Sequence, residues 1–173
     1  EHLGKLLGEH FITVTNKQHL VGNFNNHLKN KLLVFVDEAY GLTAGSANAN
    51  LKTMISGESH IIEPKGKDSY SAPNYARFII ASNDPAVISA SANERRYMVL
   101  EPSTEHQGDE AYFAGIEQDL KSGGYEALLH LLMNMSISNP EALRKPPKTT
   151  ALLQQKIANM RPVEEWWLEV LSC

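Results

Sequence analysis

The sequence predicts an α/β protein with a small parallel sheet, followed by a region of helices. Residues 31–40, KLLVFVDEAY, contain five consecutive apolar residues, a run typical of a strand buried on both faces of a parallel sheet. Residues 77–82, RFIIAS, form a second run of this kind. From residue 105 onward the apolar residues follow helical spacing instead. We therefore expect a sheet-based core over residues 1–104 and a C-terminal helical region over residues 105–173.

The composition is that of a folded globular chain. The 173 residues are 42% hydrophobic and 21% charged, which excludes wholesale disorder and fits one domain with at most a small appendage. Because the net charge is −4, any contact with nucleic acid must come from a local basic patch. The single cysteine, Cys173, excludes an internal disulfide framework and fits a reducing compartment. No apolar run reaches the length of about 20 residues that spans a membrane, so we expect a soluble cytoplasmic protein without a membrane partner.

Apolar spacing and turn residues predict the remaining elements of the core. In chain order they are a helix at residues 1–10, a strand at 11–14, a polar helix or loop at 16–28, a small-residue loop at 41–50, a helix at 51–55 and a strand at 97–100. Asn16 is placed to cap the third of these elements. Four apolar residues of that element are spaced to face the core: Leu20, Val21, Phe24 and Leu28.

The C-terminal region is expected to contain four helices. They cover residues 109–121, 125–135, 149–160 and 163–171, with glycine and proline punctuating the breaks between them. Trp166 and Trp167 lie in the last of these helices. Because aromatic side chains bury large apolar areas, we interpret this pair as a packing anchor in preference to a base-stacking platform.

Two acids close the strand of residues 31–40. Asp37 and Glu38 follow the apolar run, at the carboxyl edge of a parallel sheet, where ligands bind in open α/β folds. An apolar strand that ends in Asp-Glu is the Walker B arrangement, in which the Asp holds Mg²⁺ and the Glu polarises the water that attacks the γ-phosphate. The alternative is a strand that leaves the core through two solvated acids.

Polar residues also mark the ends of two later segments. Asn83 follows the strand of residues 77–82, where its amide can orient water or bind a γ-phosphate, or can form an ordinary Asx turn before Asp84-Pro85. Arg95 and Arg96 precede the strand expected at residues 97–100. Such arginines either form salt bridges within the chain or project into a neighbouring subunit as arginine fingers.

Residues 60–80 predict a hairpin with a basic tip. Mainly apolar arms at residues 61–62 and 76–80 flank the segment PKGKDS, which contains Pro, Gly and two lysines. Lys65 and Lys67 are suited to contact a phosphodiester backbone without reading bases. The alternative is an ordinary solvated turn.

Two common kinds of site are not indicated. Gly4-Lys5 is followed by Leu6 and not by a hydroxyl residue, so it does not fit the phosphate-binding pattern GxxxxGK[ST]. The seven histidines show no metal-ligand spacing with cysteine or with paired acids. The sequence therefore predicts neither a metal centre made of protein ligands alone nor a Ser-His-Asp triad.

The order of these motifs resembles the helicase domain of superfamily 3, and more narrowly the primase-helicases of phages and large DNA viruses, including D5-like and DUF5906-like proteins. The likeness lies in LLVFVDEA, LKTMISGESHIIEPKGK, FIIASNDPAV and NERRYMVLEP, all within residues 31–102. Residues 1–28 and the tail from residue 142 are also similar to phage members. The resemblance implies a P-loop NTPase-like, AAA+-type sheet and an ATP-dependent DNA helicase of the host cytoplasm that acts in DNA replication.

The resemblance also implies roles for single residues. Asp37 and Glu38 would be the Walker B acids, with Mg²⁺ and ATP as cofactors and Glu38 as the catalytic base. Asn83 would be the polar sensor. Such proteins form ring homo-oligomers, usually hexamers, with ATP between subunits, so Arg96, or Arg95 as second choice, would act on the neighbour's nucleotide.

The hairpin lysines have a role in the same resemblance. Lys65 and Lys67 would follow single-stranded DNA through the central channel of the ring. A primase domain on the same longer chain would be a further partner.

One part of the family pattern is missing. The Walker A loop that cradles the β- and γ-phosphates has no counterpart in these residues. We therefore expect a piece of a longer helicase that alone hydrolyses ATP poorly or not at all. One alternative is an ATPase-inactive module that binds nucleic acid and assembles through the Lys65/Lys67 hairpin. A packaging-terminase ATPase ranks lower, because the acids after Glu105 are scattered along helices and do not cluster as in a nuclease.

Overall fold

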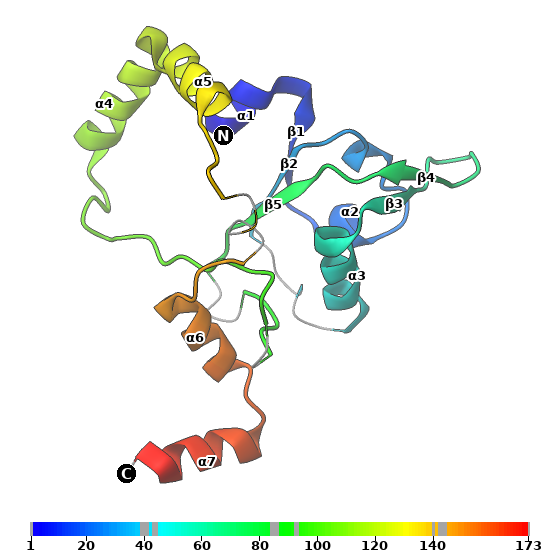
Figure 1. The fold of residues 1–173 in the computed structure, drawn as a ribbon, viewed down its shortest axis with the longest axis vertical. Coiled ribbons are helices and arrows are strands. Elements are labelled where there is room, and N and C mark those ends of the chain that lie inside the picture. Colours follow the sequence, from blue (N-terminus) through cyan, green and yellow to red (C-terminus); the bar gives the residue numbers. More distant parts are fainter. Residues whose placement is uncertain are drawn as a thin grey trace.

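The computed structural model describes residues 2–38, 42, 45–83, 87–91, 94–139, 141 and 145–172. These residues form a small parallel sheet, a separate two-stranded hairpin and a set of helices (Figure 1), which confirms the expected mixed α/β class. Within the described ranges, no helix combines the length and apolar character needed to cross a membrane. The expected boundary at residue 104 stays a prediction.

The sheet consists of three parallel strands in the order β1-β2-β5. These are β1 (Phe11–Val14), β2 (Leu33–Val36) and β5 (Arg77–Ile80), and all three coincide with predicted apolar runs. Val14 pairs with Val36, and Val36 pairs with Ile80, so the three strands end level with one another. The backbone N–H of Asp37 donates to the Val14 carbonyl at 3.0 Å, which continues the ladder by one residue. The carboxyl ends of all three strands therefore meet at one edge.

The main hydrophobic core lies between this sheet and two short helices, α2 (Lys17–Val21) and α3 (Gly45–Ser56). The buried residues that form it are Val14, Leu20, Leu28, Val34, Val36, Leu42, Leu51 and Ala76. Asn16 caps α2 as expected, since its side chain accepts a hydrogen bond from the Gln18 N–H at 2.9 Å.

Phe24 departs from the predicted core. Its side chain is 57% exposed, and its backbone is left-handed with φ of 60°. Helical spacing does not apply at this position because α2 ends at Val21 and a 3-10 turn, η2 (Asn26–Leu28), follows. The left-handed residue therefore turns its ring to solvent.

Two secondary-structure predictions are wrong. The small-residue loop expected at 41–50 is helical from Gly45 onward, because Ala47 and Ala49 favour a helix and outweigh their Ser and Asn neighbours; residues 39–41 and 43–44 lie outside the described part. Residues 97–100 are not a strand. They have no ladder partner among the described strands, and Val99 instead accepts a hydrogen bond at its carbonyl from the Thr149 hydroxyl at 2.6 Å.

The hairpin exists, but its second arm differs from the predicted one. Strand β3 (Ser59–Ile62) pairs antiparallel with β4 (Tyr70–Pro73), while the expected arm at 76–80 joins the parallel sheet as β5. Asn74 separates the two strands, because its side-chain amide donates to the carbonyls of Met54 (2.6 Å) and Gly57 (2.9 Å) at the end of α3. The hairpin consequently extends away from the parallel sheet (Figure 1).

The predicted helices of the C-terminal region are confirmed. They are α4 (Glu110–Asp119), α5 (Tyr125–Asn134), α6 (Thr150–Ala158) and α7 (Pro162–Ser172), with a π-turn at Leu120–Gly124 between the first two. The first helix of the chain, α1 (His2–Leu7), reaches α5, where His2 Nδ1 lies 2.7 Å from the Tyr125 hydroxyl. It is followed by a 3-10 turn at Gly8–His10.

The tryptophan pair does not anchor α7 in the described part of the chain. Trp166 and Trp167 are 54% and 52% exposed, and their rings contact each other with centroids 5.0 Å apart. Helix α7 lies apart from the sheet in Figure 1. Predictions that concern Asp84-Pro85, residues 142–144 and Cys173 lie outside the described residues.

We expect Asn74→Ala to lower the free energy of unfolding by about 2 kcal/mol, because it removes three hydrogen bonds and leaves part-buried carbonyls unpaired. Urea denaturation followed by circular dichroism measures the change. Ser71→Ala, at an exposed position on the neighbouring strand, is the matched control and should leave the midpoint unchanged. An unchanged midpoint for Asn74→Ala would show that the hydrogen bonds of Asn74 to the end of α3 do not stabilise the fold.

Candidate nucleotide and nucleic-acid sites

The predicted acids and the predicted sensor leave neighbouring strands at the same edge of the sheet. Asp37 directly follows β2, and Asn83 lies three residues beyond the end of β5, its parallel neighbour. The backbone N–H of Ala81 donates to the Val36 carbonyl at 2.9 Å, so the two strands stay hydrogen-bonded one residue beyond the end of β5. Asp37 is half-buried, while Glu38 and Asn83 are exposed. The expected placement of the strands is confirmed, and the chemical roles of the three residues stay predictions.

Glu38 has a strained backbone. Its φ is 52°, in the left-handed region, and among the described residues only Phe24 and Asn30 are other non-glycine residues with positive φ. A residue with a β-carbon adopts this conformation at a cost of about 1–3 kcal/mol, and such strain concentrates at functional sites. This left-handed residue lies directly after Asp37, at the point where β2 ends.

The carboxylates of this edge do not form a metal site by themselves. No group of three or more His, Cys, Asp or Glu side chains that could hold a metal ion occurs among the residues that the structure describes. Mg²⁺ commonly takes one or two carboxylates and completes its shell with water and phosphate oxygens. A single half-buried Asp37 fits an ion that arrives with a nucleotide, and this assignment also stays a prediction.

The tip of the hairpin presents both predicted lysines to solvent. Lys65 and Lys67 are exposed on either side of Gly66, whose φ of 73° allows the tight turn, and the Lys67 N–H donates to the Pro64 carbonyl at 3.3 Å. Neither lysine makes an ion pair with any described residue. Both ammonium groups are therefore available to an anion.

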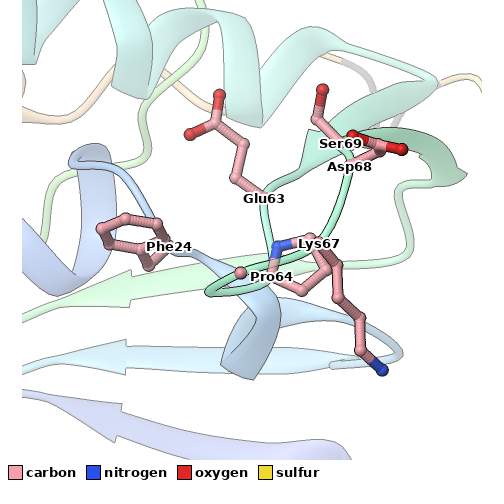
Figure 2. Close-up of a pocket in the computed structure, with 7 residues that line it drawn as sticks. Phe24, Glu63, Pro64, Lys67, Asp68 and Ser69 are labelled. Carbon is pink, nitrogen blue, oxygen red and sulfur yellow. The ribbon is translucent and has the colours of Figure 1, made fainter.

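A hollow of about 430 Å³ lies beside this tip; we call it the tip hollow. It is lined by Phe24, Glu63, Pro64 and residues 66–69. Figure 2 shows the Phe24 ring on one side of the hollow and the tip on the other. The Lys67 ammonium points away from the loop, on the opposite side from the carboxylates of Glu63 and Asp68 (Figure 2). A phosphate that approaches from the Lys67 side therefore does not meet these acids first.

Phe24 is a candidate binding residue that sequence reasoning missed. It lines both the tip hollow and a second hollow of about 800 Å³, whose other lining residues are Ile12, Gln18, His19, Gly22, Asn23 and His27. The sequence around it could have indicated this. In residues 22–26, GNFNN, the aromatic residue is surrounded by glycine and asparagine, which favour turns and left-handed backbone and not a helix.

Asn25 holds Phe24 in place beside the hairpin. Its side-chain amide donates to the Ile61 carbonyl at 2.8 Å, and its side-chain oxygen accepts from the Glu63 N–H at 2.8 Å. Nearby, the Lys29 ammonium lies 5.2 Å from the centre of the Tyr70 ring. The Phe24 ring and the tip that carries Lys65 and Lys67 therefore belong to one surface, which the hydrogen bonds of Asn25 hold together.

Glu94 organises the two candidate arginines. Its side chain is only 1% exposed, and one carboxylate oxygen accepts the backbone N–H groups of Arg95 and Arg96, each at 3.0 Å. The same oxygen lies 3.2 Å from Nη1 of Arg96, and the other lies 3.4 Å from Nζ of Lys52 on α3. The glutamate was not predicted to have a role, because its burial and its contact with Lys52 depend on a part of the chain that is distant in sequence.

Comparison with known proteins decides the family. Residues 1–96, more than half of the chain, match the family of unknown function DUF5906. The chain belongs to this family.

This DUF5906 chain is also similar to a phage protein. It is 30% identical over 102 residues to the DNA primase-polymerase of Nitratiruptor phage NrS-1. The match covers 57% of this chain and 14% of the relative, so the chain spans a small part of that protein.

Solved structures show the same fold. An apo structure of the NrS-1 C-terminal region matches with a TM-score of 0.82 at 20% identity, over 97% of this DUF5906 chain and 43% of that chain. A second apo structure of the region, its A form, matches with a TM-score of 0.80 at 21% identity and the same coverage. At these identities the likeness establishes the arrangement of elements alone, and the P-loop NTPase assignment stays a prediction.

Glu94 predicts a pH dependence of stability. Burial raises its pKa, but the N–H groups of Arg96 and Arg95, the Arg96 guanidinium and Lys52 together lower the pKa below its ordinary value of 4.5. A carboxyl whose pKa is lower in the folded state contributes stability above its unfolded pKa and loses it as pH falls through the folded value. We therefore expect the stability difference between the wild type and Glu94→Gln to shrink as pH falls below about 4.5.

Urea denaturation at several pH values between neutral and acid measures this difference. Glu101→Gln, an exposed carboxyl, serves as the control and should follow the wild-type profile. A difference that is constant over the whole range would show that the Glu94 ion pairs do not persist in solution.

Proposed function

We propose that this chain is part of a phage replication protein and forms the Walker B, sensor and DNA-tracking portion of an ATP-dependent superfamily 3 DNA helicase. The observation that carries the proposal is the pairing of β2 with β5, which sends Asp37, Glu38 and Asn83 out of one sheet edge. Similarity to a phage DNA primase-polymerase supports a role in replication. The proposal assigns the Walker A loop to another part of a longer protein.

At the sheet edge each side chain has a separate task. Asp37, half-buried and oxygen-donating, would hold Mg²⁺, which when bound neutralises charge on the β- and γ-phosphates. Glu38 accepts a hydrogen bond from the attacking water, and its left-handed backbone is a conformation that concentrates at functional sites. Asn83 orients the same water or a γ-phosphate oxygen through its amide. Phosphoryl transfer depends on the correct positioning of the reacting groups. The main contribution of this chain to catalysis would therefore be the pairing of β2 with β5, which fixes the positions of these three residues.

The hairpin surface would hold single-stranded DNA. Lys65 and Lys67 neutralise backbone phosphates, and the exposed Phe24 ring offers a face on which a base stacks. This basic surface is a local patch, and a local patch is needed because the chain as a whole has a net charge of −4. In a ring homo-oligomer with ATP between subunits, hydrolysis would move this surface along the strand.

A second function is a nucleic-acid-binding module without ATPase activity. It is favoured by Phe24, whose exposure and strained backbone serve DNA binding and need no nucleotide. The two candidate functions make different predictions for Glu38. Its replacement should abolish the activity of an ATPase, and it should have no effect on a module that only binds nucleic acid.

We expect Glu38→Gln in the full-length protein to bind ATP but to lose turnover, because the amide no longer accepts the proton of the attacking water. Release of phosphate under saturating ATP measures turnover, and equilibrium binding of a fluorescent ATP analogue measures affinity. Glu101→Gln removes an exposed carboxylate elsewhere and should keep the wild-type rate. Equal turnover in the wild type and Glu38→Gln would reject the helicase assignment and leave the binding module.

We expect Lys65→Ala with Lys67→Ala to weaken binding to labelled oligothymidine and to reduce the slope of log affinity against log salt by about 1.4, since each lost phosphate contact removes about 0.7. Phe24→Ala should lower affinity by about 1–3 kcal/mol with the slope unchanged, because stacking involves no counterion release. Fluorescence anisotropy over a series of salt concentrations separates the two effects.

The matched control is Lys145→Ala with Lys148→Ala, which removes the same charge from exposed positions outside the hairpin. This pair should keep the wild-type slope and affinity. If the control pair and the hairpin pair weaken binding equally, DNA responds to net charge and the hairpin is not its site.

A further inference from the structure

We propose that the second hollow beside Phe24 binds one base of a nucleic-acid strand and prefers adenine. We call this site the ring hollow; it has a volume of about 800 Å³ and lies among residues of β1, α2 and the turn that follows α2. The inference rests on the proposed contact between the hairpin surface and single-stranded DNA, and it adds base selectivity to that contact. The hairpin lysines cannot supply selectivity, because phosphates are the same in every sequence.

The two hollows that share Phe24 differ in charge. The tip hollow is lined by Glu63, Lys67 and Asp68 among others. Among the described residues that line the ring hollow, none is Lys, Arg, Asp or Glu. In a single strand the phosphates carry the charge, and the bases present flat faces that stack on aromatic side chains. The ring hollow therefore suits a base, while the lysines of the tip suit the phosphates beside it.

Three rings give the ring hollow flat surfaces. The Phe24 side chain is 57% exposed, and the rings of His19 and His27 meet edge to face with centroids 5.9 Å apart. His27 Nε2 donates to the His19 carbonyl at 2.6 Å, which fixes the position of the His27 ring. Unstacked bases of single strands bind on Phe and His side chains in this way. The rings therefore supply affinity that every base can use.

Two side-chain amides give the ring hollow its selectivity. Gln18 and Asn23 line it, and neither side chain makes a hydrogen bond with any residue that the structure describes. An amide offers a donor beside an acceptor, which matches N7 and N6 of adenine. On the same edge thymine offers one acceptor beside its methyl group. Guanine is typically bound by Arg or Lys and cytosine by Asp or Glu, so adenine fits this lining best.

The backbone that carries the two amides is closely packed. The Gly22 N–H donates to the Gln18 carbonyl at 3.0 Å, and a β-carbon at Gly22 would lie 2.4 Å from that carbonyl oxygen. Leu20, in the middle of α2, is 1% exposed and anchors the helix in the core. At the other end of the turn, Asn25 is hydrogen-bonded to the hairpin. The amides and the Phe24 ring are thus ordered before a base arrives, which lowers the entropic cost of binding.

The test measures the binding of short labelled oligonucleotides to the full-length protein by fluorescence anisotropy. One oligonucleotide is all thymine, and the other has a single central adenine. We expect the wild type to bind the second about 5-fold or more tightly, the effect of one well-formed amide contact with a base. Gln18→Ala and Asn23→Ala should each bring the two affinities together. A base-reading site elsewhere in the longer protein would keep its preference in these variants.

Two further variants separate base recognition from a structural role. Gln154→Ala removes an exposed glutamine from α6 and should keep the wild-type ratio of affinities. Gln18→Glu should move the preference from adenine toward an oligonucleotide with a central cytosine, because a carboxylate accepts a hydrogen bond from cytosine N4. A residue that only supports the fold would lower all affinities alike and would not change which base is preferred.

The outcomes distinguish failure of this inference from failure of the proposed function. If the wild type binds no oligonucleotide, or if Lys65→Ala with Lys67→Ala binds them all as the wild type does, the proposed DNA contact fails and the inference fails with it. If the lysine variant weakens binding but the wild type does not prefer adenine, only the inference is overturned. The same holds if Gln18→Ala and Asn23→Ala both keep the wild-type preference.

Discussion

The level pairing of β2 with β5 is the constraint on which the candidate enzyme site depends. Parallel strands that end in register deliver whatever follows them to one edge, so Asp37 and Asn83 share an edge because of backbone hydrogen bonds. A slip by one residue would turn the apolar side chains of β2 from the core to the opposite face. The burial of Val34 and Val36 therefore protects the position of the acids as well as the core.

A second constraint is the buried carboxylate of Glu94. A lone charge in this position would be costly, and here four donor groups from α3 and its own segment compensate it. The backbone around Glu94 is therefore held in place without belonging to a helix or a strand. Together with the hydrogen bonds from Thr149 and α6, it explains how residues 87–91 and 94–99 keep a defined path although the structure describes no strand in them.

Sequence reasoning succeeded where local pattern determines structure. Runs of β-branched residues located β1, β2 and β5, and apolar spacing located the four C-terminal helices. It failed where a distant partner decides. The strand expected at 97–100 has its backbone bonded by Thr149, and the hairpin arm was misassigned because the role of Asn74 depends on α3. Phe24 had the spacing of a core residue, but its left-handed backbone reverses its direction. The role of Glu94 required contacts far along the chain.

The position of β5 has a practical consequence. In the described strand order it borders the sheet, with Arg77, Phe78, Ile79 and Ile80 along an edge whose outward amides and carbonyls have no neighbouring strand. Ile79 is 43% exposed there. An apolar border of this kind templates the addition of a further strand, and in a purified preparation the nearest supply is another copy. Concentrated samples of this polypeptide by itself will therefore tend toward irregular association, and a charged substitution at Ile79 is the direct way to suppress it.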